Sequence, residues 1–134
     1  MEIGKSIYYI LSNDSDVANL VGTRIYPNRI AIDQMMPSIV YQVITTSPSN
    51  TKNGVSNLDV ISIQIYAFGI RYDQANELSL KIRNAMDYDF TNQNVGGNNI
   101  QHISFQAKTD EYDESFGDNG IHYCVLDFDI RQKI

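Results

Sequence analysis

The sequence predicts an α+β fold: an antiparallel β-sheet of about four main strands, with an N-terminal helix and one long central helix packed on one face. Residues 58–68 and 122–131 alternate apolar and polar side chains, which is the two-residue period of a half-buried strand. Residues 72–87 place apolar side chains three or four positions apart, as an amphipathic helix does. Paired strands on either side of one strong helix favour a sheet with its helices on one side.

The N-terminal part of the chain predicts two helices and a short strand. Residues 3–12 carry Ile and Leu at helical spacing. Asn13 or Asp14 then offers an N-cap to a second, shorter helix, which Gly22 ends. Residues 24–26 are expected to form a short strand, because the proline that follows has no N–H to donate to a ladder.

A long polar segment separates the two strands of the first predicted hairpin. Residues 38–46 are rich in β-branched and aromatic side chains, and we expect them to pair with residues 58–68. The connecting segment contains Asn53-Gly54, a strong turn dipeptide, and it is too polar to pack on itself. We therefore expect it to contact a neighbouring subunit or another protein. The candidate interface residues are Ser49, Asn50, Thr51, Lys52, Asn53 and Val55, together with Tyr112 from the second hairpin.

The second predicted hairpin joins residues 100–109 to residues 122–131 through an acidic tip. We expect Ile103, Phe105 and Ala107 on the apolar face of its first strand, and we expect the Asn-rich residues before it, 88–99, to form a loop. The tip lacks the glycine and the terminal glutamate of an EF-hand loop, which favours a solvated acidic surface over a calcium site. This acidic tip is a second candidate contact, either with a partner or as an acidic inner surface, and its residues are Asp110, Glu111, Asp113, Glu114 and Asp118.

Length and charge limit the classes of function. The 134 residues are expected to form one domain, residues 1–134. Ten basic and sixteen acidic residues give a net charge of −6, which disfavours general binding to nucleic acid or to an anionic membrane surface. The N-terminus carries no pattern typical of a targeting signal or a membrane span, so a cytosolic protein is expected.

The sequence offers little catalytic chemistry. It contains no phosphate-binding glycine motif and no Cys-x-x-Cys pair, and its single cysteine cannot form an intrachain disulfide. His122 and Cys124 share one strand face, but we interpret them as part of the buried stripe and not as a metal site or a thiol–imidazole pair. No catalytic residue, cofactor or metal is expected. Nine tyrosines without a tryptophan suit an interaction surface better than an active site.

Several motifs stand in a specific order along most of the chain. They are IYYILSND at 7–14, LVGTRIYP at 20–27, PSIVYQ at 37–42, an alternating strand over 59–67 and a Tyr-x-x-Ala helix over 72–86. This order resembles the phage tail-completion proteins, also called tail-terminator or head–tail joining proteins of long-tailed phages and prophages. The C-terminal third is similar to the family in pattern alone.

The resemblance implies a structural virion protein and no enzyme. Such proteins are α+β subunits that assemble, usually as a hexameric ring, on the head-proximal end of the tail tube. The ring ends tube polymerisation and offers a joining surface to the head connector. DNA passes through it without specific binding, and we expect acidic residues in its lumen to repel the phosphates. The expected location is the virion tail or neck, after assembly in the host cytoplasm.

Two alternatives remain at this stage. One is another ring protein of the phage neck or tail, such as a head-closure or tail-tube component. A tube protein would polymerise alone into long tubes, whereas a terminator would stop at a ring. The other is a small ligand-binding domain or enzyme, which would require a deep pocket with converging polar groups.

Overall fold

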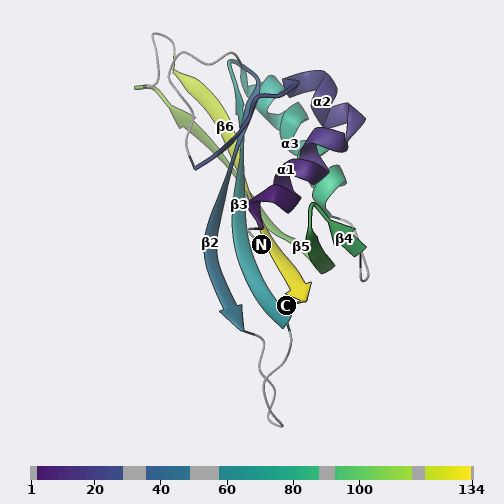
Figure 1. The fold of residues 1–134 in the computed structure, drawn as a ribbon. Coiled ribbons are helices and arrows are strands. Elements are labelled where there is room, and N and C mark those ends of the chain that lie inside the picture. The colour runs from purple at the N-terminus through teal and green to yellow at the C-terminus, as the bar shows by residue number, and fades with distance from the viewer. Residues whose placement is uncertain (1–2, 29–35, 49–57, 88–92, 116–119, 134) are drawn as a thin grey trace.

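A twisted β-sheet carries all of the described helices on one of its faces in the computed structural model (Figure 1). The structure describes residues 3–28, 36–48, 58–87, 93–115 and 120–133. Its helices are α1 (Gly4–Asn13), α2 (Ser15–Val21) and α3 (Tyr72–Met86). Its strands are β1 (Ile25–Pro27), β2 (Ser38–Pro48), β3 (Leu58–Gly69), β4 (Gln93–Val95), β5 (Asn98–Asp113) and β6 (Ile121–Lys133).

The described strands form one sheet in the order β1-β2-β3-β6-β5-β4. The two predicted hairpins are confirmed as β2–β3 and β5–β6, and β3 and β6 pair antiparallel at the centre. The prediction of about four antiparallel strands is wrong at the edges. Strand β1 runs parallel to β2, so the sheet is mixed, and β4 adds a sixth strand.

Strand β4 comes from the segment that the sequence predicted as loop. It is three residues long and returns directly into β5 through Gly96 and Gly97, both at positive φ. Glycine adopts this left-handed backbone without the clash of a Cβ, so the pair forms a tight hairpin turn. Three residues are too few to show a strand period, which is why the pattern did not reveal β4.

The core lies between the helices and the adjacent sheet face. In β3 the residues from Ile61 to Ala67 alternate between buried and half-buried, as the sequence predicted. The apolar stripe of α3 is confirmed, although Ala85 is only partly buried. Each fully buried Ile, Leu or Phe side chain contributes about 1.5–3 kcal/mol by leaving water. The largest of these side chains include Ile7, Leu11, Ile63, Ile65, Leu78, Ile82 and Phe128.

Strand β5 departs from the simple alternation that the sequence predicted. Its register with β6 shifts between Ile100 and His102 and again between Phe105 and Ala107. Because a one-residue bulge moves the following side chains to the other face, Ala107 is exposed and does not join the core. Phe105 keeps its apolar contact, with its ring 5.6 Å from that of Phe128.

Polar contacts position α1 and α2. The Asp14 carboxylate accepts hydrogen bonds from Asp16 N at 3.0 Å and Val17 N at 3.1 Å, so Asp14 is the N-cap of α2. In α1 the buried Ser6 hydroxyl donates to the Val95 carbonyl at 2.5 Å and accepts from Asn98 Nδ2 at 2.8 Å. These bonds tie α1 to the β4–β5 hairpin.

Candidate assembly surfaces

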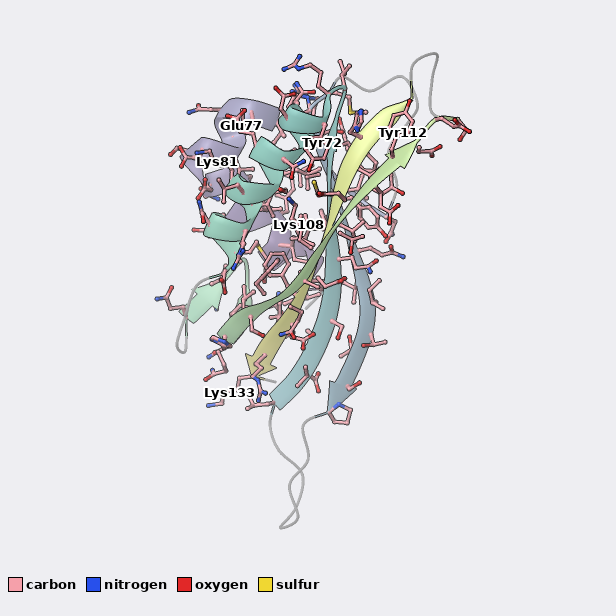
Figure 2. All side chains as sticks on the ribbon, turned by 180° about the vertical axis from the view of Figure 1, so that it is seen from behind. Tyr72, Glu77, Lys81, Lys108, Tyr112 and Lys133 are labelled. Atoms are coloured by element: carbon pink, nitrogen blue, oxygen red, sulfur yellow. The ribbon has the colours of Figure 1, made fainter. Side chains whose placement is uncertain are left out.

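The described strand ends that flank the two candidate contact regions lie at opposite ends of the sheet. Strand β3 begins at Leu58, opposite Lys133 of β6, and the β5–β6 hairpin ends where Asp113 faces Ile121. Strand β6 is 13 residues long, which corresponds to about 40 Å at roughly 3.3 Å per residue. Figure 2 shows Tyr112 and Lys133 at these opposite ends. The chain therefore enters the two candidate regions from opposite ends of β6.

Most of the candidate interface residues fall outside the part of the chain that the structure describes. Residues 49–57 connect β2 to β3 and include Ser49, Asn50, Thr51, Lys52, Asn53 and Val55, and they stay a prediction. Tyr112 is described, and its side chain is 51% exposed near the end of β5. Its ring centroid lies 4.7 Å from that of His122 on the neighbouring strand.

The acidic run does not form a single surface. The sequence predicted it as a hairpin tip, but β5 continues to Asp113, so strand alternation divides the run between two faces. Asp110 lies opposite the buried Cys124, on the α3 side of the sheet. Glu111 lies opposite Tyr123, on the side away from the helices. Glu114 lies in the turn that follows, and Asp118 lies outside the described residues.

Asp110 takes part in contacts between β5 and α3. Its carboxylate accepts hydrogen bonds from Cys124 Sγ at 3.3 Å and Tyr72 Oη at 3.2 Å, and Lys108 Nζ lies 3.3 Å away. The bond from Cys124 is the main cause that lowers the pKa of Asp110, and Lys108 and Tyr72 lower it further. Lys108 also donates to the Asn76 side chain of α3. Figure 2 shows Tyr72 and Lys108 where α3 meets β5.

His122 and Cys124 do not form a reactive pair. Burial is the main cause that raises the pKa of Cys124 to about 11, so the thiol stays protonated at neutral pH. The His122 ring lies between two tyrosines, 6.2 Å from Tyr72 and 4.7 Å from Tyr112, measured between ring centroids. Among the described residues, no three His, Cys, Asp or Glu side chains gather as a metal site would require.

The sheet face opposite the helices carries an aromatic cluster with acidic neighbours. We call it the helix-free face. The Phe68 ring centroid lies 5.3 Å from that of Tyr123 and 6.1 Å from that of Tyr66. Burial, followed by the charges of Glu111 and Asp113, raises the pKa of Tyr123. The contact between these rings depends on the β3–β6 register, which places Phe68 opposite Tyr123.

Charge on the helix-free face continues along β6. Asp127 and Asp129 lie on the same side as Tyr123, and the Asp129 carboxylate accepts a hydrogen bond from Ser62 at 3.0 Å. Strand periodicity places Arg131 and Lys133 on this face as well, toward the end where β6 finishes. On this face β6 therefore contributes two carboxylates and, at the end where the strand finishes, two cations, while Glu111 and Asp113 of β5 add further negative charge near Tyr123.

The LVGTRIYP segment has a structural role in the fold. Gly22 ends α2 at φ 59°, and its N–H donates to the Ala18 carbonyl. Arg24 then donates from Nε to the Pro37 carbonyl at 2.9 Å and from Nη2 to the Leu20 carbonyl at 3.1 Å. Arg24 thus joins the end of α2 to the chain that enters β2.

A shallow groove lies between the C-terminal ends of α1 and α3 and strand β4. It has a volume of about 410 Å³ and is widely open to solvent. Its acidic lining residue, Asp14, already serves as the α2 cap. The groove does not provide the deep site with converging polar groups that the enzyme alternative requires. None of the described helices is long and apolar enough to cross a membrane.

Comparison with known proteins identifies the family. The family model described as "Tail completion protein gp17" matches residues 5–133. The chain belongs to the tail completion protein gp17 family. This confirms the resemblance seen in the sequence and makes the chain a phage tail structural protein, located in the tail or neck of a virion.

A solved structure has the same fold. A chain described under "Virion of native gene transfer agent (GTA) particle" aligns with a TM-score of 0.65 and 14% identity, covering 96% of this chain and 92% of that chain. At this identity the likeness shows the fold alone. A comparison with curated proteins gives no match.

Proposed function

We propose that this tail completion protein forms a ring on the head-proximal end of the tail tube, where it ends tube growth and joins the tube to the head connector. Family membership supports a place in the tail. The joining role is supported by the separation, along β6, of the described strand ends that flank the two candidate contact regions. A joining protein needs distinct surfaces for two partners, and the ends of one long sheet provide them.

The helix-free face is the proposed wall of the DNA channel. Glu111, Asp127 and Asp129 lie on this face, whereas Asp110 points toward α3. A row of carboxylates repels DNA phosphates, so a duplex slides past it without being held. Placing the helices on the outside leaves the ends of the sheet available to the tube and the connector.

The polar segment between β2 and β3 is the proposed contact with the tube or with a neighbouring subunit. Replacing residues 50–56 by a Gly/Ser linker of equal length should leave a folded protein that no longer terminates tails. Electron microscopy of the assembled particles measures tail length and head attachment. A control variant is Lys81→Ala on α3, where the native side chain is half-buried, and it should keep both normal.

Each outcome of this experiment has a defined meaning. Overlong or headless tails with the linker variant support the proposal. Tails of normal length that join heads would contradict the proposed contact. The purified wild-type protein also separates the termination role from that of a tube component, because a tube protein would polymerise alone into long tubes.

A further inference from the structure

Strand β2 has an open edge over most of its length. Among the described strands, β1 pairs with it only from Ile39 to Tyr41, and no strand covers the outer edge of the segment Gln42–Pro48. This segment carries no charged residue. Its apolar side chains Val43 and Ile44 are 38% and 46% exposed. We call residues 42–48 the β2 edge.

Strand β5 has a second open edge on the other side of the sheet. Strand β4 pairs with it only at residues 98–100, and within the described chain no strand lies along the outer side of residues 103–111. We call residues 103–111 the β5 edge. Within the described residues, the backbone N–H and C=O groups on the outer side of each edge have no strand to pair with, and such a row is a template for another strand.

The directions of the strands allow the two edges to pair with each other in successive copies. Strands β2, β3, β6 and β5 alternate in direction, so β2 and β5 run antiparallel. A second copy placed beside the first continues this alternation from β5 to the next β2. All helices then stay on the same side of the joined sheet, because they cover one face in every copy (Figure 1).

Charge disfavours pairing between two identical β5 edges. Asp110 and Glu111 outnumber the one cation of that edge, Lys108, so pairing two such edges would bring together two strands that each carry net negative charge. The β2 edge carries no charge and can accept β5 without this cost. Pairing of two β2 edges would close a two-fold dimer and leave both β5 edges open.

We propose that the β2 edge of one copy pairs antiparallel with the β5 edge of a second copy. The contact joins two different surfaces of the same chain, so it repeats from copy to copy and closes into a ring where the rotation allows. The inference rests on the proposed function in one respect, because the closed ring sets the number of copies. The pairing itself rests on the two open edges and their opposite directions.

Engineered disulfides test the pairing directly. Thr45 lies opposite Ser62, and Ser104, Ala107 and Thr109 lie opposite Asp129, Asp127 and Val125, so all four side chains share the helix-free face. Thr45→Cys is combined in turn with Ser104→Cys, Ala107→Cys or Thr109→Cys, which covers the possible registers. The variants are oxidised after assembly with tail tubes from the same particle. Cys124 stays in place because it is buried.

Two controls accompany the double variants. Thr46→Cys with Thr109→Cys uses an equally exposed neighbour that points to the helix side, opposite Ile61, and it should give no crosslink. Thr45→Cys alone should also give none. With at least one double variant we expect a ladder of covalent multimers on a non-reducing gel.

A second measurement does not depend on introduced cysteines. Ile44→Lys should weaken assembly at least tenfold, because an edge lysine blocks strand addition. The control is Leu80→Lys on α3. The native Leu80 side chain is 53% exposed and that of Ile44 is 46% exposed, and the control should change assembly less than twofold. Backbone amides of both edges should exchange with deuterium more slowly in the assembled wild-type protein than in the free protein.

The outcomes separate this inference from the proposed function. If mass measurement shows a ring, but no crosslinks form and the amides of both edges exchange fast, the proposed strand pairing is wrong and the proposed ring remains. Dimers from Thr45→Cys alone overturn it in favour of two-fold β2 pairing. A protein that stays monomeric with tubes present overturns both proposals.

Discussion

The Cys124 thiol donates a hydrogen bond to the Asp110 carboxylate across the β5–β6 pair, with Sγ and Oδ1 3.3 Å apart. The bond holds the pKa of Asp110 below its usual value. Burial raises the pKa of Cys124 to about 11, and the bond to Asp110 adds to this. The pair therefore belongs to the packing between the sheet and α3, and the acidic surface proposed for DNA passage begins with Glu111 on the other side.

The thiol should make the stability of the fold sensitive to alkaline pH. An unfolded thiol ionises near pH 9.0 and the folded Cys124 near 11, so ionisation stabilises the unfolded chain. The Cys124 contribution to stability is complete below pH 9 and is lost as the pH rises toward 11. Urea unfolding from pH 7 to 11 should show wild type losing stability relative to Cys124→Ser. Parallel curves for the two proteins over this range would contradict the account.

Ser6 should be essential for fixing α1 to the β4–β5 hairpin. Ser6→Ala removes a buried hydroxyl that donates to Val95 and accepts from Asn98. We expect a loss of about 1–3 kcal/mol in the free energy of unfolding, because these buried groups lose a partner. Ser12→Ala is the matched control, since the Ser12 hydroxyl makes an exposed contact of 3.4 Å, and it should cost less than about 0.5 kcal/mol. Equal losses for both variants would count against the Ser6 network.

Arg24 should not be replaceable by lysine. The guanidinium reaches the Pro37 and Leu20 carbonyls through two different nitrogens, and one ammonium cannot reproduce this geometry. Arg24→Lys should lower the free energy of unfolding by about 2 kcal/mol. Arg71→Lys, at an exposed ion pair with Asp73, should change it by less than about 0.5 kcal/mol. Chemical denaturation measures both, and an unchanged Arg24→Lys variant would rule out this role.

The fold could be predicted from the sequence wherever an element is long enough to show its period. Strand β3 and helix α3 follow their patterns closely, and Asp14 caps α2 as one of the two candidates offered. The parallel pairing of β1 could not be predicted, because it depends on where the chain returns after Pro27. Strand β4 is too short to show a pattern.

The composition of the candidate surfaces could be predicted from the sequence, but the face of the sheet that each side chain occupies could not. The run from Asp110 to Glu114 is evidently acidic, but which of its side chains face α3 depends on how far β5 extends and where it bulges. The contact of Phe68 with Tyr123 likewise depends on the register of two strands far apart in the sequence. Register is a property of the folded sheet, and one sequence fixes it only through burial of the opposite face.

Reversing charge on the helix-free face should make the ring hold DNA. The variant Glu111→Lys with Asp127→Lys should bind duplex DNA in a salt-dependent way, because lysines release counterions from phosphates. Glu77→Lys with Asp16→Lys makes the same change of charge on α3 and α2, away from this face, and should bind at least tenfold more weakly. Gel-shift titration at several salt concentrations measures both, and equal binding would argue against the channel.

The most direct test of the ring is native mass measurement of the protein with and without tail tubes from the same particle. We expect a discrete multimer of this chain on the tube end, with no growth beyond one ring. Unlimited polymerisation, or a protein that stays monomeric and leaves the tubes growing, would contradict it.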